Sequence, residues 1–324
     1  MSFKIALIGC GNLGSRHLQA LKKTSRDIEI TICEPSMISR EIAQQRYDEV
    51  ADNPLIQKFK LIDNYEHIEK DTDLVIVATG SAERFGIVRW VVSNVSLKYM
   101  ILEKVVFQSR IEFESFAELL EDKAIKVWVN CPRRMFSYYK GLRCELLKSG
   151  RVDMRITGSD WGMGCNSIHM LDIYQYLTDC SKYEWNNEGV DQLLGDSKRK
   201  GYKEFYGNMT ITTDKGNLSI SCDKGGMNPS EIIIRYEDML IKIDETNKKA
   251  VYYDQNDTYI REENIDFLFQ SSLTNIVVED LIDTGTCDLT SYELSMKLHL
   301  VIIECFLDHM NKYFGGEYTR CPIT

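Results

Sequence analysis

The chain has 324 residues, of which 44% are hydrophobic and 27% are charged, and its formal net charge is −10. This length and composition predict a globular protein with a sizeable core, divided into two domains. The acidic balance argues against nucleic acid as a partner. The sequence lacks the roughly 18-residue apolar run that spans a bilayer, and glycines interrupt its first apolar stretch. We therefore expect a cytoplasmic protein with no membrane partner.

Short apolar runs alternate with helical patterns through the first third of the chain. This alternation predicts βαβ units and a doubly wound parallel sheet within residues 1–122. The expected strands are 3–9, 28–34, 59–62, 73–80 and 98–104. The expected helices are 13–23, 36–50, 82–95 and 110–122.

The pattern changes after residue 122, and we expect a second, α+β domain over residues 123–324. It begins with a strand at 126–132, a helix at 135–150, a strand at 153–161 and a helix at 166–177. Alternating segments from 204 to 254 predict a large, mostly antiparallel sheet with one open face, including a hairpin that turns at 214–216. Two helices near 265–283 and 290–313 end the chain, the second starting at a capping box of Thr290 and Glu293.

Three glycines follow the first strand and open a helix. Gly9, Gly11 and Gly14 form a G-x-G-x-x-G pattern in which glycines permit a tight turn, a close approach to a pyrophosphate and close helix packing. Asn12 and Leu13 complete the loop, and the helix N-terminus attracts phosphate. The alternative is a domain of the same fold that has lost its cofactor.

An acid stands about 20 residues later, where such a fold binds a ribose. Glu34 at the end of the second strand can accept hydrogen bonds from a ribose diol and would repel a 2′-phosphate, which favours NAD over NADP. Arg40 lies nearby, so use of both is not excluded.

Two further strands end in residues with ligand-binding chemistry. Thr79 and Gly80 end one strand at the edge where ligands bind, although a plain turn would have the same sequence. Glu103 and Lys104 end the next. Lys104 is suited to polarise a substrate hydroxyl, whereas the simpler alternative is a surface lysine paired with Glu103.

The helix at 166–177 carries the best candidate for a proton acceptor. Asn166, His169 and Asp172 share one helix face, and a histidine of near-neutral pKa suits proton removal from an alcohol. Asp172 or Asn166 would orient its ring. The alternative is a packed core histidine bonded to Asp172.

Other polar and aromatic side chains are candidates to bind substrate. Arg133 and Arg134 follow a strand and would hold a phosphate or a carboxylate, or else form a solvated turn. The further candidates are Trp161, Asn130 and Tyr138. The sequence offers no metal site, because its ten cysteines show no CxxC or paired spacing and read as reduced thiols.

Several segments together resemble the Gfo/Idh/MocA family of NAD(P)-dependent oxidoreductases, which act on sugars and polyols. The segments are GCGNLGSRHLQAL, DLVIVATGSAERF, LEKVVFQS, VNCPRRMFSYYKGLRCELLKSG and CNSIHMLDIYQYL, and the final RCPIT resembles members of surface-sugar pathways. The resemblance implies a Rossmann domain, a second domain whose open sheet face makes dimers or tetramers, and catalytic roles for Lys104 and His169, with Asn166 in support. It also implies that Glu103, Lys104, Thr79 and Gly80 contact the cofactor.

The chain departs from this family pattern at several positions. Val105 and Gly80 stand where the family has prolines, Arg84 replaces a frequent histidine, and Cys165 replaces an aspartate four residues before the histidine. Asn166 is the candidate to replace that carboxylate as a hydrogen-bonding group.

These features predict an NAD-dependent oxidoreductase that moves a hydride to or from a secondary alcohol of a sugar or nucleotide-sugar, in polysaccharide biosynthesis. One alternative is an enzyme that keeps NAD bound and uses transient oxidation to assist epimerisation, elimination or glycoside hydrolysis. Another is a non-catalytic NAD-binding sensor.

Overall fold

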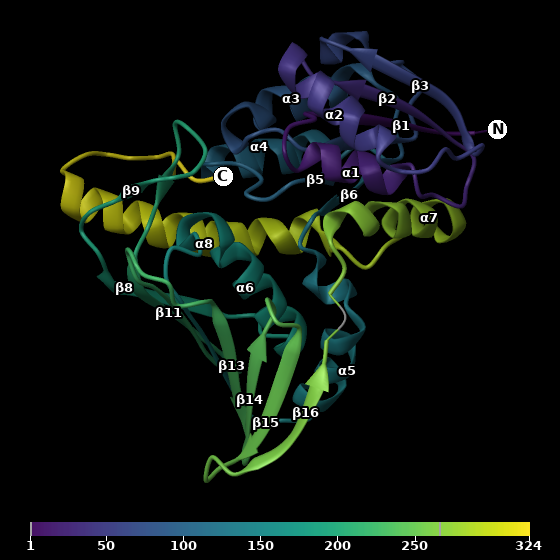
Figure 1. Cartoon of the computed structure of the whole chain (residues 1–324). Coiled ribbons are helices and arrows are strands. Elements are labelled where there is room, and N and C mark those ends of the chain that lie inside the picture. The colour runs from purple at the N-terminus through teal and green to yellow at the C-terminus, as the bar shows by residue number, and fades with distance from the viewer. Residues whose placement is uncertain (1, 266) are drawn as a thin grey trace. The chain divides into compact units, whose positions relative to one another are not determined.

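The computed structural model describes residues 2–265 and 267–324, which form two compact units (Figure 1). Unit 1 extends to Pro132 and includes Leu268–Ser295. Unit 2 comprises Arg133–Phe267 and Met296–Thr324. Residues 123–132 and 268–295, which the sequence analysis grouped with the second domain, pack in unit 1. The reason is that the strand Lys126–Val129 extends the first sheet beside Tyr99–Leu102, and the helix Thr274–Thr284 packs against the helix Gly14–Leu21.

Unit 1 is built on a parallel sheet in the strand order β17-β6-β5-β4-β1-β2-β3, with only β17 antiparallel. The central strands are apolar throughout because helices cover both faces of such a sheet. The strands are β1 (Phe3–Ile8), β2 (Ile28–Cys33), β3 (Ile56–Ile62), β4 (Leu74–Val77), β5 (Tyr99–Leu102), β6 (Lys126–Val129) and β17 (Thr290–Ser291). The predicted doubly wound fold is confirmed. The chain order reverses at β1, which pairs with both β2 and β4, so the ends of β1 and β4 form the switch point where ligands bind.

Two helices of unit 1 start at side-chain caps that the sequence supplies. Ser36 accepts a hydrogen bond from the backbone N–H of Ser39, and Ser109 caps Glu112 in the same way. The helices are α1 (Gly14–Leu21), α2 (Met37–Asp48), α3 (Ser81–Asn94), α4 (Arg110–Leu120) and α7 (Thr274–Thr284), with short 3₁₀ turns η1 (Tyr65–His67) and η3 (Gln270–Ser272). The helix expected near 265–283 therefore starts later, after η3, and Asp266 lies outside the described residues.

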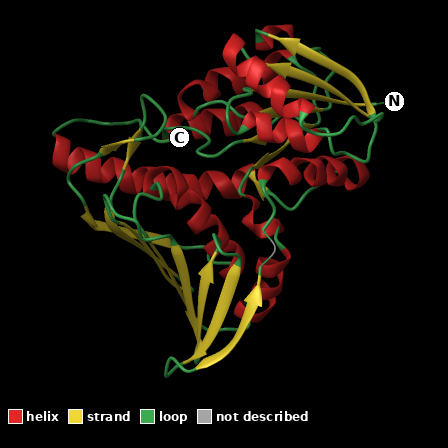
Figure 2. Ribbon diagram, viewed as in Figure 1, coloured by secondary structure: helices red, strands yellow, loops and turns green. Residues whose placement is uncertain are grey.

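Unit 2 is built on a mostly antiparallel sheet in the order β16-β15-β14-β13-β7-β12-β11-β8, whose strands are yellow in Figure 2. The predicted hairpin is confirmed, since β11 and β12 pair antiparallel across the turn at 214–216. The strands are β7 (Val152–Thr157), β8 (Tyr183–Val190), β11 (Gly207–Thr213), β12 (Gly216–Cys222), β13 (Glu231–Tyr236), β14 (Met239–Asp244), β15 (Lys249–Asp254) and β16 (Tyr259–Asn264), and β9 (Gly195–Asp196) pairs with β10 (Lys203–Glu204).

One face of this sheet is covered by α6 (Met163–Thr178), which packs on β7 and β12, and α5 (Ser137–Leu146) packs on α6. Tyr174 of α6 donates from its hydroxyl to the carbonyl of Val152 at 2.9 Å, which fixes the helix to β7. Arg133 and Arg134 lie in the 3₁₀ turn η2 (Pro132–Met135). The long helix α8 (Tyr292–Phe314) begins in unit 1. Its start is capped by Ser291, whose hydroxyl accepts from Leu294 N–H at 3.4 Å, rather than by the expected Thr290, which pairs with Val129 in the sheet.

No helix in the described part of the chain is both long and apolar enough to cross a bilayer.

Candidate functional site

The glycine loop lies directly after β1, and each glycine meets a different physical demand. Gly9 has a positive φ of 87°, and a Cβ atom there would lie 2.9 Å from Thr79. A Cβ on Gly14 would overlap with the carbonyl oxygen of Gly9. Gly11 is exposed, and a Cβ there would meet no atom within 4 Å. Gly9 and Gly14 are therefore required by packing, whereas the backbone at Gly11 faces an open space.

The start of α1 is the part of the loop that a pyrophosphate would approach. Leu13 stands at the N-cap position and makes no side-chain capping bond, while the N–H groups of Ser15 and Arg16 donate to the carbonyls of Gly11 and Leu13. The carbonyl of Asn12 accepts from Ser15 and from the Arg46 guanidinium, each at 3.1 Å. Arg46 thus places a positive charge beside the loop. Sequence analysis missed it, because one arginine in the last turn of a helix carries no signal of its own.

Glu34 is buried at the end of β2, where its carboxylate braces the glycine loop. One oxygen accepts from the backbone N–H of Cys10 at 2.8 Å, and the other accepts from Ser36 N–H at 3.0 Å. Each carboxylate oxygen can accept a second hydrogen bond, so the group keeps capacity for a ribose hydroxyl. The Arg40 guanidinium donates to the carbonyl oxygens of Glu34 at 2.6 Å and Pro35 at 3.1 Å, which places a cation at the same strand end.

Thr79 and Gly80 follow β4 beside the glycine loop, with Gly80 at the N-cap of α3. Arg84, one turn into α3, is buried and donates to the carbonyls of Thr79, Val105 and Val106. It therefore ties the end of β4 to the segment after Lys104. These hydrogen bonds give a structural role to Arg84, which the sequence showed only as a departure from the family pattern.

Glu103 and Lys104 follow β5 and differ in environment. Lys104 is partly exposed, whereas Glu103 is buried and lies within hydrogen-bonding distance of His17 and Asn130. Burial disfavours the charged form of Glu103, but the hydrogen bonds from His17 and Asn130 and the nearby charge of Lys104 hold its pKa below the ordinary value. The Glu103 carboxylate is thus directed into unit 1, and Asn130, a candidate for substrate binding, belongs to the same buried group.

The candidate residues of unit 2 surround a cavity of about 240 Å³. Asn166, His169 and Met170 of α6 line one side, and Ile156 and Ile232 of the covered sheet face line another. The remaining lining residues are Arg133, Trp161, Ser230 and Glu245. Arg133, Trp161, Asn166 and His169, all of them candidates from the sequence, therefore lie around one cavity, whereas Arg134, Asn130 and Tyr138 do not line it.

The charge of Arg133 is compensated within the cavity wall. Its guanidinium donates two hydrogen bonds to the carboxylate of Glu245, at 2.7 and 2.5 Å, and the Tyr139 hydroxyl donates a third at 3.0 Å. Burial opposes ionisation of Glu245, and the Arg133 charge outweighs it, so the pKa of Glu245 lies below its ordinary value. Glu245 was not among the sequence candidates, since it follows a β-strand 112 residues after Arg133.

Arg134 has a different environment from Arg133. It is buried and donates to both carboxylate oxygens of Asp172, at 2.9 and 3.1 Å. Its guanidinium also lies 5.0 Å from the ring centre of Tyr176. Arg134 thus fixes η2 to α6 and lies outside the residues that line the cavity, and the Asp172 carboxylate serves this ion pair.

The first turn of α6 holds Asn166 in place. Its side-chain amide donates to the carbonyl of Trp161 at 2.8 Å, and the Trp161 indole donates to Ser221 at 2.8 Å. Cys165 donates to the carbonyl of Gly162 at 3.4 Å. Among the described residues, Asn166 and not Cys165 lines the cavity. The described residues contain no group of three or more His, Cys, Asp or Glu that could hold a metal ion.

The strand order, the glycine loop at its switch point and the acid after β2 define a dinucleotide-binding fold of the Rossmann class. Residues 3–131 match the model of one family, GFO_IDH_MocA, described as the oxidoreductase family with an NAD-binding Rossmann fold. Residues 3–131 are thus an NAD-binding Rossmann domain of the Gfo/Idh/MocA oxidoreductase type. No curated protein sequence matches it.

Solved structures with the same fold include proteins of different activities. An oxidoreductase from Agrobacterium radiobacter in complex with NAD+, L-tartaric acid and magnesium has 14% identity and a TM-score of 0.73 over 96% of this chain and 97% of that one. UDP-N-acetylglucosamine 3-dehydrogenase GnnA from Acidithiobacillus ferrooxidans has 12% identity and a TM-score of 0.70 over 94% and 97%. The transcriptional regulator Gal80p from Kluyveromyces lactis has 15% identity and a TM-score of 0.71 over 96% and 90%. At these identities the likeness shows the fold alone.

Proposed function

We propose that this protein is a cytoplasmic NAD-dependent oxidoreductase that transfers a hydride to or from a secondary alcohol of a sugar or nucleotide-sugar, in polysaccharide biosynthesis. The observation that carries the proposal is the unit 2 cavity, which combines a histidine with hydrogen-bonding side chains and no uncompensated charge.

The cavity wall suits a neutral polyhydroxy ring better than an anion. The only cation among its lining residues, Arg133, is paired with Glu245, so a phosphate or carboxylate there would have to displace that carboxylate. Asn166, Ser230 and His169 offer both donors and acceptors. Its volume of about 240 Å³ is below the roughly 300 Å³ at which pockets for drug-sized ligands begin. One sugar ring is therefore the class of group that we expect it to hold.

The proposal gives each of the candidate residues one task. The open backbone at Gly11 and the first turn of α1 hold the pyrophosphate, and Glu34 accepts from the ribose. When bound, NAD supplies the hydride acceptor at its nicotinamide ring. His169 takes the proton of the substrate hydroxyl, and Lys104 donates a hydrogen bond to the oxygen as negative charge develops on it.

The test is incubation of the full chain with NAD and a panel of free and nucleotide-linked sugars, with absorbance of the reduced nicotinamide as the readout. We expect NADH to accumulate with at least one sugar and the oxidised sugar to appear by mass spectrometry. A sugar that changes while no NADH accumulates would favour transient oxidation with bound NAD. NAD binding without any sugar turnover over the whole panel would contradict an enzymatic role.

A second candidate, an NAD-binding regulator, draws support from the fold shared with the transcriptional regulator Gal80p. The replacement of the family aspartate by Cys165 points the same way, because it removes a carboxylate from the first turn of α6. The two candidates differ in their dependence on Lys104 and His169. A regulator would keep its NAD affinity and its effect when either side chain is replaced.

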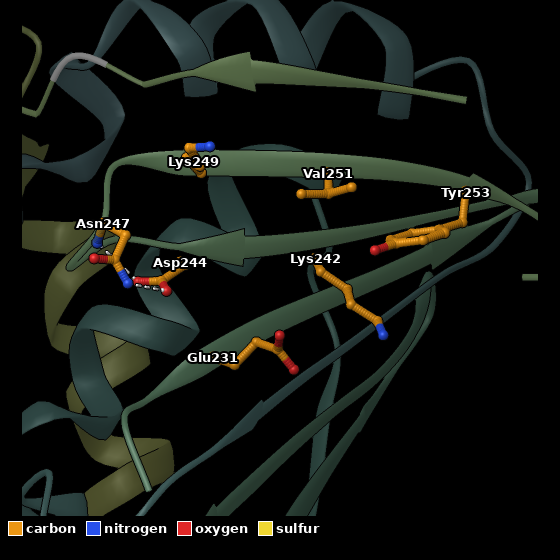
Figure 3. A pocket seen from close by; sticks show the side chains of 7 residues that line it. All are labelled: Glu231, Lys242, Asp244, Asn247, Lys249, Val251 and Tyr253. Carbon is orange, nitrogen blue, oxygen red and sulfur yellow. Dashed lines mark hydrogen bonds between the residues drawn. The ribbon is translucent and has the colours of Figure 1, made fainter. Parts of the chain in front are cut away.

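We also propose that the open face of the unit 2 sheet pairs with a second copy of the chain, as a homodimer or within a homotetramer. Figure 3 shows side chains that line a depression of about 500 Å³ on this face. It carries two acids, Glu231 and Asp244, and two lysines, Lys242 and Lys249. A face of mixed charge can complement itself across a two-fold axis. Light scattering of Val251→Glu should then report monomers where the unmodified chain reports an oligomer.

A further inference from the structure

Five side chains in unit 1, one of which is that of Glu103, form a closed ring of hydrogen bonds. The Nε2 atom of His17 lies 2.8 Å from Oε1 of Glu103, and the Asn130 amide donates to the same oxygen at 2.5 Å. Asn130 also donates to the side-chain oxygen of Gln270 at 2.9 Å. The Gln270 amide donates to the Thr274 hydroxyl at 2.9 Å. That hydroxyl closes the ring, because it lies 2.8 Å from Nδ1 of His17.

One arrangement of protons gives every contact of the ring a donor and an acceptor. The Thr274 hydroxyl donates to Nδ1 of His17, and the proton on Nε2 of His17 donates to the Glu103 carboxylate. Asn130 uses its two amide protons on Glu103 and Gln270. Each of the five contacts then joins a donor to an acceptor, with Glu103 ionised. A largely buried network of hydrogen bonds of this kind makes its surroundings rigid.

The ring joins the segments that the proposed function uses separately. His17 lies in α1, one turn after the glycine loop, and Glu103 immediately precedes Lys104. Asn130 follows β6. Gln270 lies in η3, 140 residues after Asn130, and Thr274 lies in the first turn of α7. No step of the proposed mechanism uses the side chains of His17, Asn130 or Thr274 directly.

We propose that this ring is a positioning network that fixes Lys104 relative to α1, so that NAD on the glycine loop and the order of Lys104 are coupled. The inference deepens the proposed function and, in its second half, rests on it. His17 and Glu103 are positioning residues: they act on the reaction through the backbone that carries Lys104. Linked equilibria are reciprocal. If bound NAD favours the ordered Lys104 segment by some factor, then disordering that segment weakens NAD binding by the same factor.

The test compares three variants of the full chain by amide hydrogen exchange, with and without NAD. Glu103→Gln keeps the shape of the side chain but presents an amide to the donors of His17 and Asn130. His17→Phe keeps a ring of similar size and removes both nitrogens. The control is Glu112→Gln, since Glu112 is also buried in unit 1 but accepts from the backbone of Gln108 and the hydroxyl of Ser109.

Without NAD, we expect exchange of residues 103–107 to rise about tenfold or more in Glu103→Gln and His17→Phe, the scale expected when a buried group loses a partner. It should stay unchanged in Glu112→Gln. With NAD, exchange should fall at both 11–17 and 103–107 in the unmodified chain, but only at 11–17 in the ring variants. Equal protection of 103–107 in all the proteins would overturn the positioning role.

The experiment also separates the inference from the proposed function. If NAD protects no segment of the unmodified chain while the ring variants still loosen 103–107, the positioning role is supported and NAD-linked function is overturned. If NAD protects 11–17 and leaves 103–107 unchanged in the unmodified chain, the coupling is overturned while NAD binding stands. Glu103→Gln, with its preserved shape, decides the result should His17→Phe fail to fold.

Discussion

Gly14 packs against the carbonyl group of Gly9 so closely that a Cβ atom on Gly14 would overlap with the carbonyl oxygen. This contact closes the loop between β1 and α1 upon itself. The middle glycine of the motif has no such neighbour, because a Cβ on Gly11 would point into open space. The glycines therefore separate into two that packing requires and one that leaves room for a ligand.

Replacing Gly11 and Gly14 by alanine should have different effects, one on NAD affinity and the other on stability. Gly11→Ala adds a methyl group where we place the pyrophosphate, so NAD affinity should fall at least tenfold with the melting temperature nearly unchanged. Gly14→Ala should lower the melting temperature by several degrees, since over-packing costs about 1–3 kcal/mol. Calorimetry and thermal melts decide both. Normal NAD affinity in Gly11→Ala would show that the pyrophosphate does not approach this backbone.

Glu34→Ala should weaken NAD more than NADP. The carboxylate braces Cys10 of the glycine loop, so both cofactors should lose some affinity. Only NAD also loses the hydrogen bonds from its ribose diol, which we expect to cost a further tenfold or so in affinity. Titration calorimetry with both dinucleotides measures the ratio. Equal losses would leave Glu34 a structural role and remove it from cofactor selection.

Lys104→Ala should lower the turnover rate of the sugar that the panel identifies by a factor of about 10² or more, while NAD affinity changes little. The reason is that the ammonium group stabilises charge on the substrate oxygen only in the transition state. Stopped-flow absorbance measures the rate and fluorescence titration the affinity. Lys104→Arg keeps the charge and serves as the matched control. Full activity in Lys104→Ala would exclude it from the mechanism.

His169→Asn should lower the rate by about 10² to 10⁴ and flatten its rise with pH near neutrality, as expected on removal of a general base. Asparagine keeps a hydrogen-bonding group against the cavity, so sugar binding should be retained. The pH dependence of kcat is the deciding measurement. An unaltered profile would return His169 to a structural role on α6.

Glu245 should contribute stability that is lost in acid. Its pKa in the folded chain lies below the ordinary value of 4.5, so the folded state binds fewer protons than the unfolded state. The contribution is therefore present above about pH 4.5 and disappears as the pH falls through the lowered pKa. Denaturant titrations from pH 7 to pH 3 should show a weaker pH dependence for Glu245→Gln than for the unmodified chain. Parallel curves would contradict this assignment.

Local sequence patterns determined most of the fold, because hydrophobic periodicity and turn residues act over short distances. The apolar strand ending at Ile8, the glycines after it and Glu34 predicted a dinucleotide-binding sheet. The hairpin of β11 and β12 followed from alternation around residues 214–216. The segment at 268–295 was assigned to the second domain because nothing in its own pattern indicates the α1 surface against which α7 packs.

The tertiary structure alone decided the partners of the charged and polar candidates. Adjacent arginines look alike in sequence, yet Arg133 pairs with Glu245 beside the cavity and Arg134 pairs with the buried Asp172. In the same way, Glu103 meets His17 from 86 residues away. Such pairs depend on which strands and helices are neighbours in space. Folding buries these charged groups away from water, and this is unfavourable unless each one meets a partner.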